Sequence, residues 1–307
     1  MINQKHLYRL EQIHDFDNLE LIARFVVEGF ITGLHKSPYH GFSVEFAEHR
    51  QYNTGESTKD IDWKLYARTD RLYIKKYEEE TNLRSYIAID TSGSMIFPLN
   101  NKEKVNKLAF SVISSAALIH LLRNQRDAVG LMLFNKKVDT FTSTRISLLH
   151  AKHLFNKLKE ALNANNINKT SNISYSLHFL AENAHKRSLI IIFSDMFYKH
   201  NEELYSALQH LRFRKHEVIL FHVFDSRLEE NFMYSNRPYK FIDLETNKEI
   251  KLNPNEIRIN YTKKINEIRN RLIEKCIQFQ IDYIEADINK EFSQVLLPYL
   301  VKRSRLF

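Results

Sequence analysis

Residues Arg84–Met95 read RSYIAIDTSGSM, and this stretch decides the fold class. It joins a short apolar run of β-branched and aromatic residues to an acidic residue, Asp90, and then to a polar turn. Further apolar runs of similar length lie at 128–134, 187–193, 217–224 and 281–285. Continuous apolar runs of this length are typical of parallel strands that are buried on both faces.

Longer amphipathic stretches separate these runs. They have helical spacing and lie at 102–123, 147–162, 173–185, 202–211, 254–279 and 291–301. Strands that alternate with helices in this way form parallel sheets with crossover helices. We therefore expect an α/β fold with a doubly wound, mainly parallel sheet, whose ligands bind at the carboxyl ends of the strands.

Two parts of the chain depart from this alternation. Residues 239–252 predict a hairpin that is inserted before the last long helix and turns at Thr246–Asn247. The first 84 residues predict a helix near 18–31 and extended segments at 41–52 and 72–80, without a convincing core of their own. We expect an N-terminal α+β extension, residues 1–84, attached to an α/β domain, residues 85–307.

The composition indicates a folded protein of a reducing compartment. The chain has 307 residues, 43% of them apolar, which is enough to bury a core and excludes disorder for most of the chain. The single cysteine, Cys276, excludes an internal disulfide. The first residues lack the apolar run of a signal peptide or membrane anchor, and no apolar window reaches the length of a membrane span. We expect a cytoplasmic protein without a membrane span.

The net charge of +8 raises the question of nucleic-acid binding. Residues 1–84 carry 12 basic and 14 acidic side chains, and residues 85–307 carry 33 basic and 23 acidic ones, a balance of +10. The excess is spread along the chain and forms no basic block with interleaved aromatic residues. Nucleic-acid binding therefore stays a weak alternative.

The motif that carries chemistry follows the first strand of the α/β domain. Asp90, Ser92 and Ser94 form a D-x-S-x-S arrangement, and a second strand ends in Ser194 and Asp195. Because the carboxyl ends of parallel strands meet at one edge of a sheet, these oxygen-bearing side chains are expected to converge. Carboxylate and hydroxyl oxygens suit a divalent cation such as Mg²⁺ or Mn²⁺. The alternative interpretation is purely structural: these serines and aspartates only cap helices or turns.

This order of residues resembles the metal-ion-dependent adhesion site of the von Willebrand factor A family, from residue 85 to the C-terminus. The resemblance implies that Ser92 and Ser94 bind the metal directly. It implies that Asp90 and Asp195 act mainly through bound waters. Fold and site are then those of a von Willebrand A-like domain.

The family also uses a hydroxyl from a loop between these two strands. Its pattern T-D-L-x-x-x-L, counted back from Leu177, places Ser171 in the position of the threonine. Thr170, one position earlier, is the residue type that the family uses. Both residues stay candidates for the loop ligand.

A second motif precedes the first. The segment 45–68 follows the pattern E-F-x(3)-R-x-Y-x(2)-G-[DE]-x(5)-D-W-x(3)-A-R, with Glu45, Arg50, Tyr52, Gly55, Asp62, Trp63 and Arg68 at fixed positions. This pattern resembles the signature of the bacterial MoxR-associated family known as domain of unknown function 58. We interpret its charged residues as a structural network, in which arginine bridges carboxylates, and not as a catalytic site.

The two resemblances together imply a function. Proteins of that family are typically encoded beside a MoxR-type AAA+ ATPase and are thought to work with it in chaperone-like assembly or activation. An adhesion-type site leaves the cation with an open position, which an acidic residue of a protein client can fill. We therefore expect a non-enzymatic interaction or adaptor protein.

The alternative is a Mg²⁺-dependent phosphohydrolase that uses Asp90 as its nucleophile. Phosphatases of the haloacid dehalogenase type need a second acid two residues later, and that position is Ser92, which cannot protonate a leaving group. The chain also contains neither a G-x-S-x-G elbow nor a G-x-x-x-x-G-K-[ST] loop. The sequence thus favours interaction over catalysis.

Overall fold

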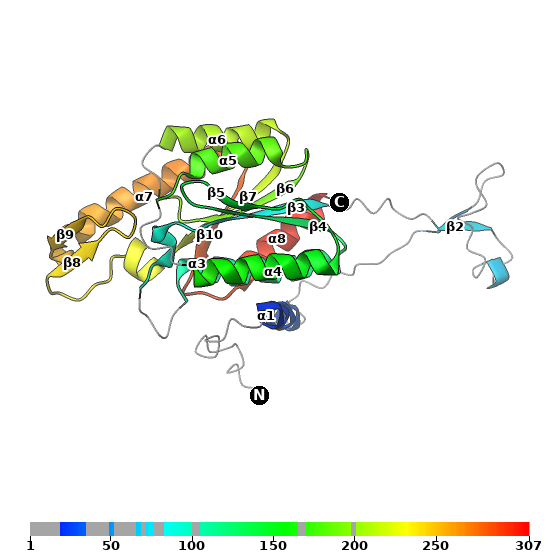
Figure 1. Cartoon of the computed structure of the whole chain (residues 1–307), viewed down its shortest axis with the longest axis horizontal. Coiled ribbons are helices and arrows are strands. Elements are labelled where there is room, and N and C mark those ends of the chain that lie inside the picture. The colour runs from blue at the N-terminus through cyan, green and yellow to red at the C-terminus, as the bar shows by residue number, and fades with distance from the viewer. Residues whose placement is uncertain are drawn as a thin grey trace. The chain divides into compact units, whose positions relative to one another are not determined.

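The computed structural model describes residues 19–34, 49–51, 66–68, 72–75, 83–99, 105–164, 170–197 and 201–306. A six-stranded sheet in the order β10-β7-β6-β3-β4-β5 forms its centre (Figure 1). The strands are β3 Arg84–Asp90, β4 Ala128–Phe134, β5 Val138–Phe141, β6 Leu189–Ser194, β7 Glu217–Phe224 and β10 Asp282–Asp287. Neighbouring strands are parallel except for the pair of β4 and β5. The expected doubly wound, mainly parallel α/β fold is confirmed.

Strand β3 lies inside the sheet, between β4 and β6. Ile87 and Ile89 pack into an apolar core on one face, while Tyr86 and Ala88 pack into a second core on the other face. Successive side chains of a strand point to opposite faces, so a central strand has to be apolar at every position. This explains the uninterrupted apolar run that precedes Asp90.

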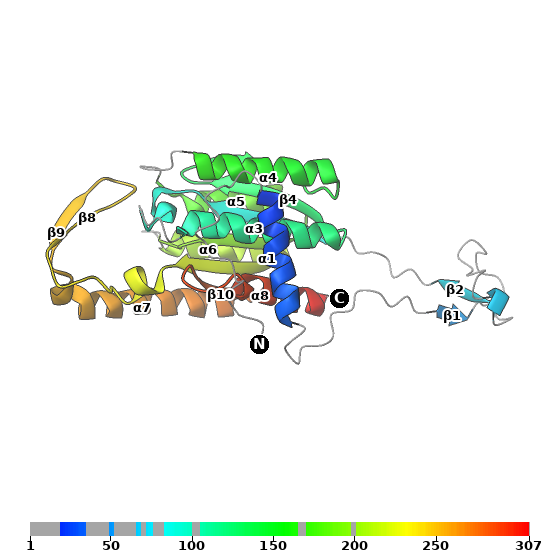
Figure 2. The ribbon, with the colours of Figure 1, turned by 90° about the horizontal axis from the view of Figure 1, so that it is seen from below.

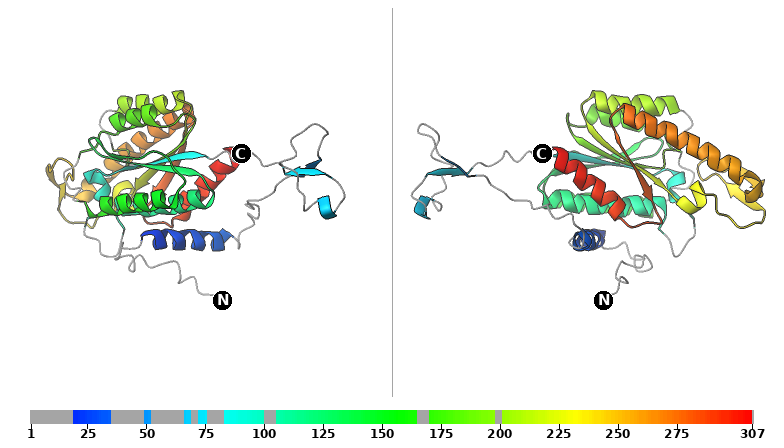
Figure 3. Two further views of the ribbon diagram at one scale, coloured as in Figure 1. Left: turned by 45° about the vertical axis from the view of Figure 1, so that its right-hand side comes forward. Right: turned by 180° about the vertical axis from the view of Figure 1, so that it is seen from behind.

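Helices cover both faces of the sheet (Figures 1 and 3). One core includes side chains of α1 Leu19–Leu34, α3 Lys107–Asn124, α4 Leu148–Asn163 and α8 Ser293–Leu306. The other includes side chains of α5 Ile173–Asn183, α6 Asn201–Phe213 and α7 Pro254–Gln278. Each predicted amphipathic stretch overlaps one of these helices.

Helix α3 is apolar on almost every side because it lies between the sheet and other helices. It contacts α4 and α8 as well as β3, β4 and β7, and Leu108–Ile119 is buried throughout. The Asn106 side chain caps its start by accepting a hydrogen bond from the backbone N–H of Ala109 (2.8 Å). None of the described helices combines the length and apolar character that crossing a membrane requires.

Strand β5 is an element that the sequence patterns do not predict. It pairs antiparallel with β4, with Met132 opposite Phe141, and the register shifts between Leu133 and Phe134. The strand has only four residues and is half-buried, so it carries no clear apolar period. Its Phe141 ring stacks on Tyr86 of β3 with ring centroids 5.6 Å apart, a contact that only the folded chain creates.

Strands β8 Tyr239–Ile242 and β9 Glu249–Leu252 form an antiparallel hairpin within the segment for which the sequence predicts one. An aromatic cluster joins the base of this hairpin to α7, because the Phe232 ring lies 5.5 Å from Phe241 and 4.4 Å from Tyr261 between centroids. Figure 2 shows the hairpin beside the end of α7 that projects past the sheet, with its turn directed back toward the sheet.

The chain divides into two compact units, residues 1–31 with 83–307 and residues 32–82. In the first unit, Leu19, Ala23 and Val27 of α1 are buried at a spacing of four residues, as expected for one face of a helix. In the second, β1 His49–Gln51 and β2 Tyr73–Lys75 form an antiparallel pair. The domain boundary after residue 84 stays a prediction.

Candidate functional site

Asp90 ends the central strand β3 and is almost completely enclosed, with 1% of its surface exposed. Its Oδ1 accepts a hydrogen bond from the backbone N–H of Ser92 (2.9 Å). Its Oδ2 accepts hydrogen bonds from the hydroxyls of Ser194 (3.0 Å) and Ser171 (3.2 Å). One carboxyl group therefore connects three parts of the chain: the turn after β3, the end of β6 and the loop before α5.

The turn after β3 is held against β4, so its serines have a defined position. Both the backbone N–H and the hydroxyl of Thr91 donate to the carbonyl oxygen of Phe134, at 2.7 and 2.9 Å. The hydroxyl oxygens of Ser92 and Ser94 lie 3.1 Å apart. Two hydroxyls of the D-x-S-x-S motif thus face a common point at the sheet edge.

The loop before α5 places Ser171 at Asp90, as its hydrogen bond shows. The neighbouring Asn172 fixes this loop, since its N–H donates to the carbonyl oxygen of Asn135 (2.9 Å) and its side chain caps α5. Thr170 makes no hydrogen bond to this group among the described residues. The geometry therefore associates Ser171, and not Thr170, with the site.

Asp195 follows β6 and is held by a lysine that the sequence patterns do not single out. The Nζ of Lys107 lies 2.8 Å from Asp195 Oδ2 and 2.5 Å from Glu229 Oε1. Lys107 is 1% exposed, and Asp195 is 5% exposed. The ammonium group is thus enclosed between two carboxylates, one after β6 and one in the helical turn Ser226–Glu230 after β7.

These carboxyl groups do not ionise alike. Burial, reinforced by the charge of Asp195, raises the pKa of Asp90 to about 7. Burial also acts to raise the pKa of Asp195, but the ammonium of Lys107 outweighs it and lowers that pKa below its ordinary value. Burial alone would lower the pKa of Lys107, but Asp195 and Glu229 raise it instead. Lys107 therefore stays charged and keeps Asp195 charged.

A further acidic side chain reaches this edge from the β8–β9 hairpin. The Oε2 of Glu245 accepts a hydrogen bond from the backbone N–H of Ser171 (3.3 Å). Burial raises the pKa of Glu245, and the charge of Asp195 raises it further. The site therefore contains more acidic groups than its sequence motif indicates.

Sequence reasoning missed Lys107, Glu229 and Glu245, and only the first had a local signal. A lysine as the first residue of a long apolar helix is unusual, because a positive charge at a helix N-terminus is unfavourable unless an acidic partner compensates it. Glu229 and Glu245 lie 122 and 74 residues from the side chain or backbone group that each contacts. No spacing rule along the chain connects them.

The residues of the upstream signature cannot be related to this site. Glu45, Tyr52, Gly55, Asp62 and Trp63 lie outside the described residues. The strand that includes Arg50 is described but its side chain is not, and Arg68 is exposed in a short helical turn. Their role as a structural network stays a prediction.

The donor set fits a small, hard cation. In the described part of the chain, no group of three or more histidine, cysteine, aspartate or glutamate side chains is arranged to hold a metal ion, so hydroxyls would have to contribute. Hydroxyls do converge at Asp90: Ser171 donates to its carboxyl group, and the hydroxyls of Ser92 and Ser94 lie together in the turn that follows. The pKa of Asp90 is raised because its carboxyl group is buried beside the charge of Asp195. A divalent cation would relieve that repulsion. Enclosure of Asp90 disfavours the alternative in which it attacks a phosphate ester.

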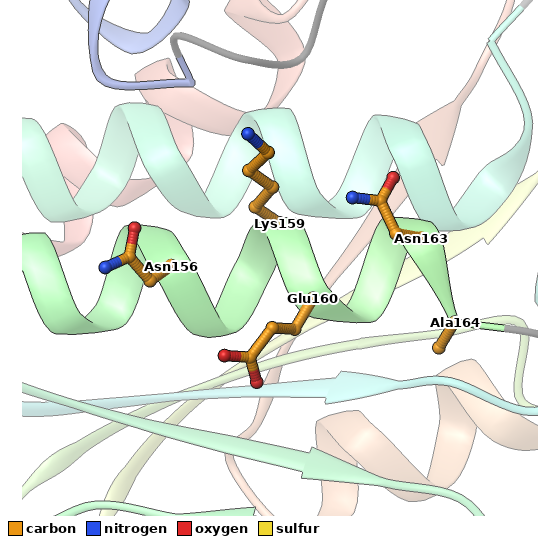
Figure 4. Close-up of a pocket in the computed structure, with 5 residues that line it drawn as sticks. All are labelled: Asn156, Lys159, Glu160, Asn163 and Ala164. Atoms are coloured by element: carbon orange, nitrogen blue, oxygen red, sulfur yellow. The ribbon is translucent and has the colours of Figure 1, made fainter.

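A separate hollow of about 460 Å³ lies along the end of α4, lined by Asn156, Lys159, Glu160, Asn163 and Ala164 (Figure 4). Its side chains come from a single stretch of chain. Figure 4 shows Lys159 and Glu160 pointing in opposite directions, so they do not converge on a common ligand. The hollow therefore offers no second candidate site.

Comparison with known sequences identifies a family. Residues 48–271 match the family described as "Protein of unknown function DUF58". The uncharacterized protein Mb1516 of Mycobacterium bovis is 25% identical over 132 residues, which are 43% of this chain and 41% of the relative. The chain thus spans about two fifths of the length of this relative.

Comparison with solved structures gives distant similarities. BatB of Bacteroides thetaiotaomicron is 16% identical, with a TM-score of 0.42, over 73% of this chain and 100% of that one. The SpRpn10 VWA domain is 15% identical, with a TM-score of 0.31, over 46% of this chain and 75% of that one. The fold assignment rests on the strand order and register described above, and not on these superpositions.

Proposed function

The chain belongs to the DUF58 family, and from this membership and the geometry of its sheet edge we propose that it is a non-enzymatic interaction protein with a divalent-cation site. The observation that carries the proposal is the convergence on Asp90 of hydroxyls from separate segments. Asp90 accepts hydrogen bonds from Ser171 and Ser194, beside the paired hydroxyls of Ser92 and Ser94.

The proposed site uses hydroxyls as the direct ligands. Ser92, Ser94 and Ser171 would hold Mg²⁺ or Mn²⁺, and Asp90 and Asp195 would act mainly through waters. When bound, the cation supplies positive charge and an open coordination position for an aspartate or glutamate of a partner. Because few carboxylates would bind it directly, little of its charge is neutralised.

The remaining groups position these ligands. The Asp90 carboxyl accepts hydrogen bonds from the hydroxyls of Ser171 and Ser194. The Ser194 oxygen in turn accepts one from the backbone N–H of Met196 (3.0 Å), whereas the Ser171 oxygen keeps its lone pairs for a cation. Lys107 fixes the Asp195 carboxylate. Asp90, Ser194, Lys107 and Asp195 are buried and Ser171 is half-buried, so none of these positioning groups is an exposed side chain.

The proposed partners are a MoxR-type AAA+ ATPase and a protein client that presents an acidic residue. The family resemblance supports the ATPase, and the absence of a phosphate-binding loop from the sequence means that nucleotide energy would have to come from a partner. The charge of +10 on residues 85–307 favours approach of acidic surfaces.

Thermal unfolding with and without Mg²⁺ or Mn²⁺ tests the cation site. At about 100 times its Kd, a cation that binds only the folded state adds about 2.7 kcal/mol, roughly 5–10 °C in Tm. Asp90→Asn should abolish this shift. Asp287→Asn, which alters a buried aspartate at the end of the edge strand β10 of the same sheet, should retain it. A wild-type protein whose Tm ignores both cations would contradict the proposal.

The partner is tested by retention of the co-expressed ATPase on immobilised protein. Binding should require Mg²⁺, disappear with a chelator, and fail with Asp90→Asn. Binding that persists unchanged under all three conditions would place the interaction elsewhere on the protein.

A further inference from the structure

The turn between β8 and β9 carries an acidic side chain to the candidate site. Glu245 lies in this turn, and its carboxylate accepts the hydrogen bond from the backbone N–H of Ser171 (3.3 Å). A side chain of the hairpin thus contacts a loop that the proposed cation site uses.

The turn itself determines where Glu245 lies. Oδ1 of Asp243 accepts hydrogen bonds from the backbone N–H groups of Glu245 (2.9 Å) and Thr246 (3.3 Å), and its backbone oxygen accepts one from Asn247 (2.8 Å). Asn247 adopts a φ of 58°, a left-handed conformation that asparagine tolerates better than most residues. The backbone of the turn is therefore held before any ligand binds.

The charge environment of Glu245 is unfavourable without a cation. No ion pair within the described part of the chain includes Glu245, and the charges of Asp195 and Asp243 disfavour its ionised form. A partly buried carboxylate beside other carboxylates needs a compensating positive charge. Lys107 does not provide it, because its ammonium group is bonded to Asp195 and Glu229.

On the basis of the cation site proposed above, we propose that Glu245 is an internal ligand of that site. Its carboxylate takes the open position that the acidic side chain of a partner would otherwise fill. The β8–β9 hairpin then covers the site, and a partner binds by displacing Glu245.

The hairpin is built so that such a displacement is feasible. Both of its strands are largely exposed, and its anchorage is the aromatic cluster at its base, around Phe232 and Tyr261. The turn meets the site through the hydrogen bond between the Glu245 carboxylate and the backbone N–H of Ser171, and any other carboxylate can accept the same hydrogen bond. A carboxylate of a partner can replace it at little net cost.

Calorimetric titration of the 307-residue chain with Mn²⁺ alone tests this inference. Glu245→Gln keeps the size of the side chain and removes its charge, and we expect it to weaken Mn²⁺ binding about tenfold, as loss of a partner at a metal site does. Glu249→Gln is the matched control, because Glu249 belongs to the same hairpin and pairs with the exposed Lys240. It should bind Mn²⁺ as the wild type does.

Hydrogen exchange of residues 243–248 provides a second readout. Mn²⁺ should slow exchange in this turn of the wild type and leave it unchanged in Glu245→Gln. Glu245→Gln that binds Mn²⁺ as tightly as the wild type, or an equal weakening in Glu249→Gln, would overturn the inference and leave the cation site standing. A wild-type protein that does not bind Mn²⁺ would overturn the proposed function itself, and the inference with it.

Discussion

Replacement of Lys107 by methionine should destabilise the protein strongly. Lys107, with 1% of its surface exposed, is bonded to Asp195 and Glu229, whose side chains are 5% and 28% exposed. Removing one partner of a buried ion pair costs about 3–5 kcal/mol, because the other charge stays buried without compensation. Since Glu229 is partly exposed, we expect about 3 kcal/mol, or a fall in Tm of about 6–12 °C.

Urea unfolding of Lys107→Met and of Lys240→Met measures this effect. Lys240 pairs with Glu249, and both side chains are about half exposed, so its loss should cost no more than about 1 kcal/mol. If the two variants lose the same stability, the buried ion pairs of Lys107 contribute little and the reasoning is refuted. If the cation site exists, Mg²⁺ should raise the unfolding free energy of Lys107→Met by more than it raises that of the wild type. The reason is that the substitution removes a positive charge from beside the site.

Two further predictions concern the fold and its dependence on pH. Gly130→Ala should cost about 1–3 kcal/mol in urea unfolding, because the new Cβ would lie 2.8 Å from the carbonyl oxygen of Thr142 and 3.0 Å from the Tyr86 ring. Burial would raise the pKa of Glu217, but its ion pairs, chiefly with Lys302, lower that pKa below the ordinary 4.5. The ion pairs of Glu217 therefore stabilise the fold above pH 4.5, and this stabilisation is lost as the pH falls below that value. The wild type should be more stable than Glu217→Gln by up to about 1 kcal/mol at neutral pH, and this difference should shrink in acid. A difference that grows in acid would contradict this sign.

Lys107 and Glu245 have opposite effects on the charge balance at the sheet edge. Lys107 compensates Asp195 and Glu229 permanently, because all three groups belong to the packed unit. Glu245 arrives on an exposed hairpin and adds a carboxylate that no described side chain compensates. The first contact stabilises the edge, whereas the second is the one that a ligand can replace.

The local pattern of apolar and polar residues was sufficient to predict most of the helices and strands. Strands β3, β4 and β7 coincide with apolar runs, because a strand buried on both faces has to be apolar at every position. Strand β5 escaped prediction because four half-buried residues carry no distinguishable period. Its pairing with β4 and the stacking of Phe141 on Tyr86 form only when the chain has folded.

The candidate site divides in the same way. The sequence alone determined that Asp90, Ser92, Ser94 and Asp195 lie at the same edge of the sheet. The carboxyl ends of parallel strands share this edge, and the conformation of the loops does not change that. Only the tertiary structure decided that Ser171 and not Thr170 contacts Asp90, and that Lys107, Glu229 and Glu245 join the group. Those contacts depend on the angles at which separate helices and a hairpin pack on the sheet, which no spacing between neighbouring residues records.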